Sequence, residues 1–178
     1  MTKNSIPELY LELSDDQWSY EFTDHDRQIA RAIVYDDQGY FYFVRAVRDD
    51  DFGSATTIET AGGGVEDGEE LEAAIIRELG EELGAEVEIK GKIGVVSDYY
   101  NLIHRHNINN YYLCRATSFS ERHLTEDEIE RFHLSTLKLT FDQAVSEYEN
   151  SRKYPLGRLI AARELPILLH AGKMLKLQ

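Results

Sequence analysis

Hydrophobic and polar positions alternate along much of the chain, which is the pattern of half-buried strands. Two such segments, residues 28–35 and 40–47, are rich in β-branched and aromatic side chains and flank the polar sequence Asp36-Asp37-Gln38-Gly39. A short connection containing Asp and Gly predicts a β-hairpin here. Further strands are predicted over residues 18–22, 55–60, 87–99 and 107–117, with a polar loop over 48–54 and a hairpin loop over 101–110.

The pattern changes to a helical period after three consecutive glycines at 62–64. Apolar side chains then recur at the spacing of one helix face, at Leu71, Ala74, Ile75, Leu79 and Leu83. This spacing predicts an amphipathic helix of about four turns. We expect Asp67 to be its N-cap, with Glu70 completing a capping box, and Gly84 to end the helix.

The C-terminal part of the chain is predicted to be mainly helical. Helices are expected over residues 124–132, 141–148 and 156–169, the last of them broken or restarted at Pro166. The sequence shows neither an internal repeat nor a Pro/Gly/Ser linker, so we expect one domain over residues 1–178. Strands interleaved with a few helices predict an α/β (α+β) fold built on a mixed sheet.

Acidic side chains are concentrated in one part of the sequence. The chain has 33 Asp and Glu against 19 Lys and Arg, a formal net charge of −14, and residues 59–88 contribute −10 of it. An acidic protein repels phosphate backbones and anionic lipids, so we expect neither duplex nucleic acid nor a membrane as partner. Clustered carboxylates need either solvent or divalent cations, and their positions decide between the two.

Cys114 is the only cysteine, which excludes an intramolecular disulfide. It follows the apolar residues Tyr111-Tyr112-Leu113, where a buried structural thiol is expected instead of a nucleophile. The sequence has no apolar leader segment and no stretch of about 18 uncharged apolar residues. These observations predict a cytoplasmic protein.

Three carboxylates share one side of the predicted helix, because Glu78, Glu81 and Glu82 stand at positions i, i+3 and i+4. Like charges at this spacing repel one another. A solvated acidic face would tolerate them, whereas a divalent cation would convert their repulsion into coordination. Oxygen ligands suit Mg²⁺, Mn²⁺ or Ca²⁺ better than zinc. The glycines before the helix allow the backbone to approach a metal or a phosphate closely.

This segment resembles the Nudix box, the sequence signature of the Nudix hydrolases: Gly63-x5-Glu69-x7-Arg77-Glu78-Leu79-x-Glu81-Glu82-x-Gly84. Every fixed position of the box is present. The chain departs from the common pattern at Ala85, where the family usually has a larger aliphatic residue, and at Ala61, where many members have proline. The resemblance implies a mixed sheet sandwiched between helices.

The resemblance also implies an activity, hydrolysis of a diphosphate bond in a nucleotide-type substrate with Mg²⁺ or Mn²⁺. It assigns the metals to three side chains and one main-chain carbonyl, those of Glu78, Glu81, Glu82 and Gly62. It further gives Arg77 the role of orienting a carboxylate within the catalytic group, and gives Gly63 and Glu69 the role of supporting the loop. The substrate would be a small nucleotide diphosphate, and dimers are frequent in the family, which makes a homodimer one expected assembly.

The general base and the substrate contacts remain open at the level of sequence. In this family the base is either a glutamate of the box or an acid in a later loop, and four acids are available there: Glu121, Glu126, Asp127 and Glu128. Arg45 and Arg48 are candidates for binding substrate phosphates. They are equally good partners for the acids at 49–51.

Two other functions stay possible on the same fold. The first is a non-catalytic sensor that binds a nucleotide or an ADP-ribose-like ligand, although pure binding does not require a charged metal cluster. The second is an isomerase of isoprenoid diphosphates, which needs a cysteine at its site. The identity of the nucleotide substrate is not determined by these patterns.

Overall fold

The computed structural model describes residues 6–177 of the chain. Its centre is a mixed eight-stranded sheet in the order β1-β6-β7-β2-β3-β4, in which β5 pairs with β2 and β8 pairs with β3. The strands are β1 (Leu9–Glu12), β2 (His25–Tyr35), β3 (Phe41–Asp50), β4 (Gly53–Glu59), β5 (Ala61–Gly64), β6 (Ala85–Tyr100), β7 (Arg105–Phe119) and β8 (Ser135–Leu139).

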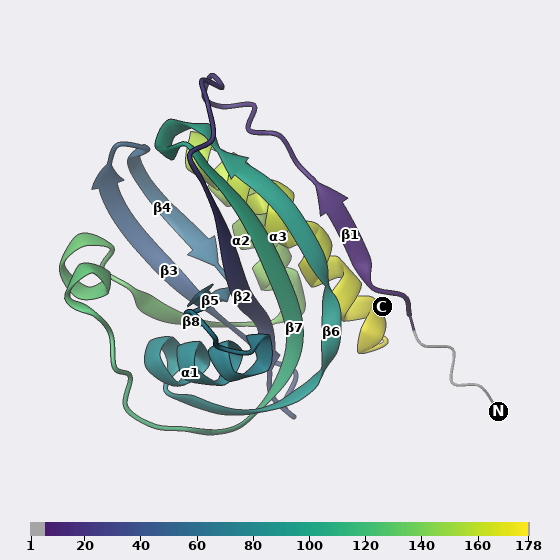
Figure 1. Cartoon of the computed structure of the whole chain (residues 1–178). Helices are drawn as coiled ribbons and strands as arrows, with labels where there is room; N and C mark the ends of the chain where they lie inside the picture. The colour runs from purple at the N-terminus through teal and green to yellow at the C-terminus, as the bar shows by residue number, and fades with distance from the viewer. Residues whose placement is uncertain (1–5, 178) are drawn as a thin grey trace.

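The sheet divides where the predicted hairpin opens. β2 and β3 pair only next to their turn, at Val34–Tyr42 and Tyr35–Phe41, whereas β2 pairs in parallel with β7 along its whole length. Beyond Tyr42, β3 pairs with β4 over Val44–Asp50 instead of with β2, and β8 pairs with β3 over Phe41–Arg45. Figure 1 shows the two arms, β3 and β4 on one side and β2, β7 and β6 on the other, with β5 lying between them.

Helices cover both faces of the sheet (Figure 1). α1 (Leu71–Leu83) lies on one face, and α2 (Phe141–Ser151) and α3 (Pro155–Met174) lie on the other. Alternate residues of β2 point to opposite faces, so that Ala32 packs in the core under α1 and Ile33 in the core under α2 and α3. The predicted mixed sheet sandwiched between helices is therefore confirmed.

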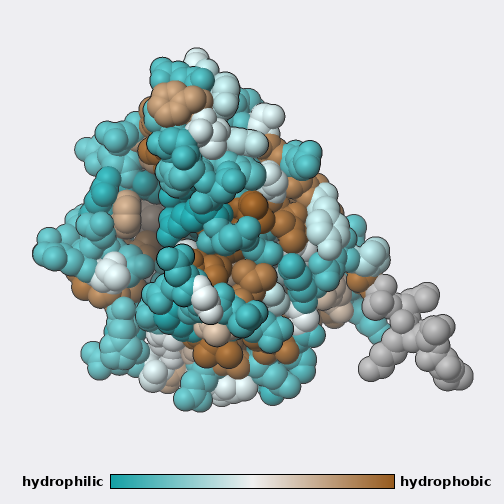
Figure 2. All heavy atoms as spheres, viewed as in Figure 1, coloured by the Kyte–Doolittle hydropathy of each residue, from teal (hydrophilic) through white to brown (hydrophobic). Residues whose placement is uncertain are grey.

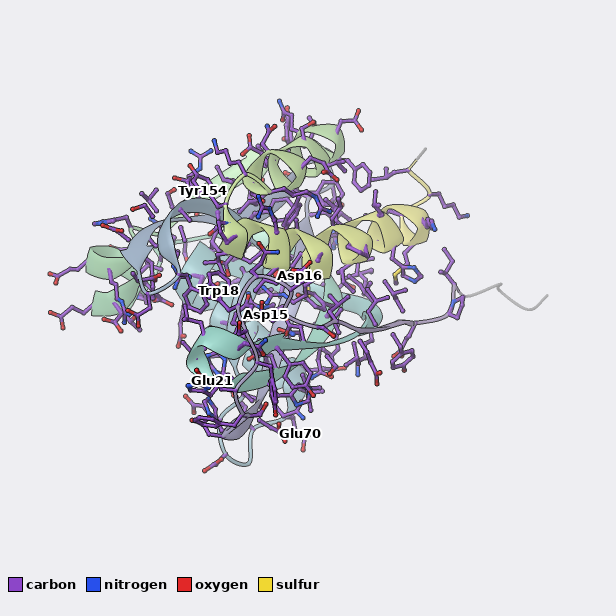
Figure 3. All side chains as sticks on the ribbon, turned by 90° about the horizontal axis from the view of Figure 1, so that it is seen from above. Asp15, Asp16, Trp18, Glu21, Glu70 and Tyr154 are labelled. Atoms are coloured by element: carbon purple, nitrogen blue, oxygen red, sulfur yellow. The ribbon has the colours of Figure 1, made fainter. Side chains whose placement is uncertain are left out.

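The N-terminal segment differs from the prediction. Residues 18–22, which lie within the described range, form no strand; the short strand is β1, which pairs in parallel with β6. The segment after β1 is held by side chains instead of a ladder. The Asp15 carboxylate accepts from the Asn101 amide N–H at 2.8 Å, and the Arg158 guanidinium donates to Gln17 at 3.0 Å. Figure 3 shows Asp15 and Trp18 on this segment, passing close to α3.

Two predicted loops are shorter than their polar composition suggested. The 48–54 loop is a turn at Asp51 and Phe52, because β3 runs to Asp50 and β4 starts at Gly53. The 101–110 loop ends at His104, where a single left-handed residue (φ 53°) leads into β7. Polar side chains fit into these strands because they find partners, as when Ser54 donates to Asp49 at 2.6 Å.

The boundaries of α1 are partly as predicted. Gly84 ends the helix in the left-handed conformation (φ 63°), which is confirmed. The Asp67–Glu70 capping box is wrong: the helix begins after Glu70, and among the described residues no side chain caps it. The loop before the helix is fixed differently, because the Glu69 carboxylate accepts from the Glu66 N–H and from Arg77.

The C-terminal helices are longer and more continuous than predicted. α3 runs through Pro166 without a break. Proline there removes one backbone hydrogen bond, and the packing of the buried residues on either side of it holds the helix together. The predicted helix over 124–132 is one five-residue π-helical stretch, η2 (Asp127–Arg131).

None of the helices described is long and apolar enough to cross a membrane. In Figure 2 hydrophobic residues lie in small groups on a largely hydrophilic face.

Substitution of two glycines, one inside α1 and one directly after it, should change stability in opposite directions. At Gly84, an added Cβ would lie 2.1 Å from the Ser120 carbonyl oxygen and would require a left-handed backbone. We expect Gly84→Ala to lower the free energy of unfolding by about 1–3 kcal/mol. At Gly80, no atom of the described chain lies within 4 Å of an added Cβ, so Gly80→Ala should raise it by about 0.5–1 kcal/mol. Urea denaturation measures both changes, and the same sign for both would contradict this description.

Candidate functional site

The glycine strand β5 is joined to α1 by a direct hydrogen bond. The Gly62 N–H donates to Glu82 Oε2 at 2.8 Å. Gly62 has φ 141°, and an added Cβ would lie 2.2 Å from the Ala30 carbonyl oxygen. At Gly63 an added Cβ would lie 2.5 Å from the Glu78 carboxylate. Glycine is therefore required at both positions for the strand to approach the helix carboxylates.

Arg77 connects the carboxylates of this region to one another. Its Nε and Nη2 each donate to the Glu69 carboxylate at 2.9 Å, a bidentate pair. Its Nη1 lies 2.7 Å from Glu78 and 3.4 Å from Glu81, and Nη2 donates to the Gly64 carbonyl at 3.1 Å. The pair with Arg77 lowers the pKa of Glu69 to about 2. Arg77 thus fixes both the glycine loop and the acidic face of α1.

Of the three carboxylates on one face of α1, those of Glu78 and Glu82 are buried and that of Glu81 is not. Burial is the main cause that raises the pKa of Glu78 and raises that of Glu82 to about 8. The Gly62 N–H and the Arg31 guanidinium act in the opposite direction on Glu82, while the negative charges of Glu78 and Glu128 add to the increase. The site therefore holds negative charge in a place where that charge is poorly solvated.

A cavity of about 160 Å³ opens beside Glu82. Glu128 and two arginines, Arg31 and Arg48, line it from η2, β2 and β3. Arg48 pairs with Asp50, with its Nε 2.7 Å from the carboxylate, and its guanidinium lies 4.8 Å from the centre of the Phe132 ring, which also lines the cavity.

The other sequence candidates lie elsewhere. Arg45 lines a separate cavity beside α2, with Glu147 and Tyr154. Of the later acids, Glu121 and Asp127 line two further surface cavities, and only Glu128 lines the cavity of Glu82. The structure therefore brings together Arg77, the box glutamates, Gly62, Gly63, Glu69, Arg48 and Glu128, and leaves Arg45 outside.

The donor set fits a hard divalent cation. Carboxylate oxygens on one helix face, together with an adjacent glycine backbone, are the ligands that Mg²⁺ and Mn²⁺ prefer. Within residues 6–177, no three acidic, His or Cys side chains converge closely enough to hold a metal as they stand. Glu78 instead contacts Arg77, and Glu82 contacts the Gly62 amide. A cation would relieve the charge that burial disfavours at Glu78 and Glu82.

Three residues behind the site were missed from the sequence. Arg31 lines the cavity and donates to the Thr60 carbonyl at 2.9 Å, and Glu164 accepts from the Thr60 N–H at 2.8 Å. A signal for two of them does exist. Arg31 is a charged residue in the apolar strand sequence Ile29-Ala30-Arg31-Ala32-Ile33, and Glu164 lies with Arg163 between the apolar runs Leu159-Ile160-Ala161-Ala162 and Leu165-Pro166-Ile167-Leu168. Charged residues in buried segments require partners, which makes them markers of an internal polar network.

Comparison with known proteins places this geometry in a family. The family model of the NUDIX domain matches residues 25–157, about three quarters of the chain. The chain therefore belongs to the Nudix family, and the box residues on α1 occupy the arrangement just described. No curated protein sequence matches the chain.

Solved structures share the fold at low sequence identity. A NUDIX hydrolase from Nitrosomonas europaea superimposes with a TM-score of 0.62 at 14% identity, over 85% of this chain and 89% of that one. A MutT protein from Methanosarcina mazei gives 0.59 at 15%, over 89% and 99%. A MutT NUDIX hydrolase from Burkholderia pseudomallei gives 0.55 at 22%, over 67% and 86%. The chain thus has the fold of Nudix hydrolases.

Burial of Glu82 makes the stability of the metal-free protein depend on pH. A carboxyl group whose pKa is raised by folding contributes stability at low pH that is lost as the pH rises through the folded-state value, here about 8. Glutamine cannot ionise and can still accept from Gly62. We expect Glu82→Gln to unfold like the wild type at pH 5 in EDTA, and to be more stable by on the order of 1–3 kcal/mol at pH 8.

Thermal denaturation in EDTA at the two pH values measures this difference. The matched control is Glu81→Gln, because the Glu81 side chain is 43% exposed and its replacement removes a better solvated charge. The difference in stability between Glu81→Gln and the wild type should change less from pH 5 to pH 8 than the difference between Glu82→Gln and the wild type. A stability difference between Glu82→Gln and the wild type that is the same at pH 5 and pH 8 would contradict the assignment.

Proposed function

We propose that the protein is a divalent-metal-dependent hydrolase that cleaves a diphosphate bond in a nucleotide-type substrate. One observation carries this proposal: Glu78, Glu81 and Glu82 lie on one face of α1, and Glu82 is tied to the glycine strand by the Gly62 N–H. Membership of a family of hydrolases supports it. The proposed substrate is a small molecule, part of which would enter the 160 Å³ cavity beside Glu82.

Each residue of the site has a role in this proposal. Glu78, Glu81, Glu82 and the Gly62 carbonyl would hold Mg²⁺ or Mn²⁺, which when bound neutralises charge on the diphosphate and makes the attacking water more acidic. Arg77 orients Glu78 and Glu81 and supports the loop through Glu69. These contacts keep the ligands preorganised, which is the main contribution of the protein to metal-assisted hydrolysis.

The positive charge near the carboxylates provides a place for the substrate diphosphate. Arg31 and Arg48 reach the same cavity as Glu82 from opposite arms of the sheet. Guanidinium groups bind phosphate oxygens through directed hydrogen bonds. We therefore propose Arg48 and Arg31 as substrate contacts. Arg45 lines a different cavity and is not included.

Among the later acids, Glu128 is the best candidate for the general base. It lines the cavity, is half-buried, and lies close enough to Glu82 for its charge to raise the pKa of that residue. Its Oε2 accepts from the Thr125 N–H, which orients the carboxylate. A base must reach the proton that it removes, and the neighbouring Asp127 lines a different cavity.

The alternatives are less well supported. A sensor would bind its ligand without metal and would not need three carboxylates on one face of a helix. An isoprenoid diphosphate isomerase would need a reactive cysteine. Burial raises the pKa of Cys114 to about 12 in the core under α1, so its thiol stays protonated at neutral pH.

A panel of nucleoside diphosphate-linked compounds, incubated with Mg²⁺ or Mn²⁺ and assayed by chromatography for the nucleoside monophosphate product, tests the proposed activity. We expect turnover of at least one member of the panel by the wild type. Glu81→Gln and Glu82→Gln should lower kcat by about 100-fold or more, because each removes a metal ligand. A wild type that hydrolyses nothing, but binds a nucleotide tightly in EDTA, would favour the sensor. Full activity in both variants would refute the metal assignment.

The choice of base is tested by two substitutions in adjacent positions of η2. We expect Glu128→Gln to lower kcat by about 10²–10⁴-fold, the usual contribution of a general base, with little change in KM. Asp127→Asn removes the same charge one residue earlier, from a side chain at another cavity, and should retain kcat within about threefold. Steady-state kinetics at saturating Mg²⁺ measure both. Equal effects of the two substitutions would exclude Glu128 as the base.

A further inference from the structure

Thr60 is a one-residue corner between two strands that have different partners. β4 ends at Glu59 and pairs with β3, whereas β5 begins at Ala61 and pairs with β2. The chain therefore passes from one arm of the sheet to the other at Thr60, two residues before Gly62. Since the Gly62 N–H holds Glu82, the position of this corner determines where the glycine strand meets α1.

Every polar atom of this corner is held by a charged side chain. The Thr60 N–H donates to Glu164 Oε2 at 2.8 Å, and its hydroxyl donates to Glu164 Oε1 at 2.7 Å. From the other side, Arg31 Nη1 donates to the Thr60 carbonyl at 2.9 Å. Thr60 and Glu164 are both 0% exposed, so bulk water does not compete for these bonds. Hydrogen bonds to charged groups in such surroundings are among the strongest in proteins.

Glu164 is fixed by partners other than Thr60. The hydroxyl of Tyr148 donates to it at 2.7 Å, the hydroxyl of Tyr111 at 3.2 Å, and Arg163 Nη2 at 3.0 Å. Burial alone would raise the pKa of Glu164, but the positive charges of Arg163 and Arg31 and the hydroxyls of Thr60 and Tyr148 lower it, which keeps the carboxylate ionised. An acceptor held this firmly determines the position of the backbone that donates to it.

Glu164 also lies outside the part of the chain that the family defines. The family match ends at residue 157, and Glu164 stands seven residues later, in the middle of α3. We propose that Glu164 is a positioning residue which, through Thr60, holds the Gly62 loop in the geometry that binds a divalent cation. The inference rests on the proposed function, because that function gives the loop its metal.

A purely structural role would have a different outcome. If the contacts of Glu164 with Thr60, Tyr148 and Tyr111 only joined α3 to the sheet, their loss would lower stability and leave metal affinity unchanged in the folded protein. Outer partners that orient metal ligands typically contribute about 10–100-fold to metal affinity. Metal affinity measured well below the unfolding temperature therefore separates positioning from support.

The test compares two substitutions of Thr60 in the full chain. Thr60→Val keeps the shape and the N–H but loses the hydroxyl, and Thr60→Ser keeps the hydroxyl but loses the methyl group. Tyr148→Phe is an intermediate variant: it removes one of the donors that fix Glu164 and leaves both Thr60 contacts in place. Glu164→Gln is a fourth variant, which removes the charge itself. Circular dichroism identifies the temperature range in which each variant is folded.

Two readouts are measured in that range. Mn²⁺ affinity is obtained from the electron paramagnetic resonance signal of free Mn²⁺. Amide hydrogen exchange, followed by mass spectrometry in metal-free protein, reports on the peptide that covers residues 58–64. We expect Thr60→Val and Glu164→Gln to weaken Mn²⁺ binding about 10-fold or more and to accelerate exchange of this peptide. Thr60→Ser, the matched control, should stay within about threefold of the wild type in affinity, and Tyr148→Phe should fall between Thr60→Ser and Thr60→Val.

The outcomes that overturn the inference differ from those that overturn the function. Unchanged Mn²⁺ affinity in Thr60→Val and Glu164→Gln, beside a wild type that binds Mn²⁺ and hydrolyses a nucleotide, refutes positioning and leaves the hydrolase proposal intact. A wild type that neither binds Mn²⁺ nor hydrolyses refutes the proposed function. In that case the exchange measurement still tests whether Glu164 fixes the backbone at Thr60. Equal exchange of the 58–64 peptide in all variants would refute this contact's role.

Discussion

Repulsion between carboxylates on one face of α1 is the constraint on which the rest of the site depends. Glu78 and Glu82 are buried, and burial raises the pKa of both, so their charges oppose the packing of α1 on the sheet. The surrounding structure compensates with directed contacts. Arg77 holds Glu78, and a backbone N–H of the glycine strand holds Glu82. The helix is thereby kept in a position where these oxygens remain near one another without a cation.

The divided sheet provides the space for these contacts. Because β2 and β3 separate soon after their turn, the strand β5 can lie beside β2 and face the carboxylates of α1. The same separation brings Arg31 and Arg48 to one cavity from different arms. A continuous β2–β3 ladder would close this space. Glu82 lies at this opening, where arginines from both arms approach, so part of the acidic charge of the chain faces the cavity.

Local patterns in the sequence were enough to predict the sheet, its covering helices and the residues of the box. They failed where a contact depends on partners distant in sequence. The strand expected at 18–22 was replaced by packing of Trp18 against Phe52, 5.3 Å between ring centroids. The Asp67–Glu70 capping box is a separate, local failure, because the helix begins only after Glu70. Glu128 could not be selected among the later acids, since its place at the cavity follows from how η2 folds back over β3.

The single-residue corner at Thr60 has a mechanical consequence. One residue spans the change of partner between the two arms, and all of its polar atoms are bonded. No flexible loop separates the β3–β4 arm from the glycine strand β5. A rotation of that arm, such as one caused by a ligand against Arg48, would therefore also move Gly62. Because Gly62 contacts Glu82, α1 would move with it.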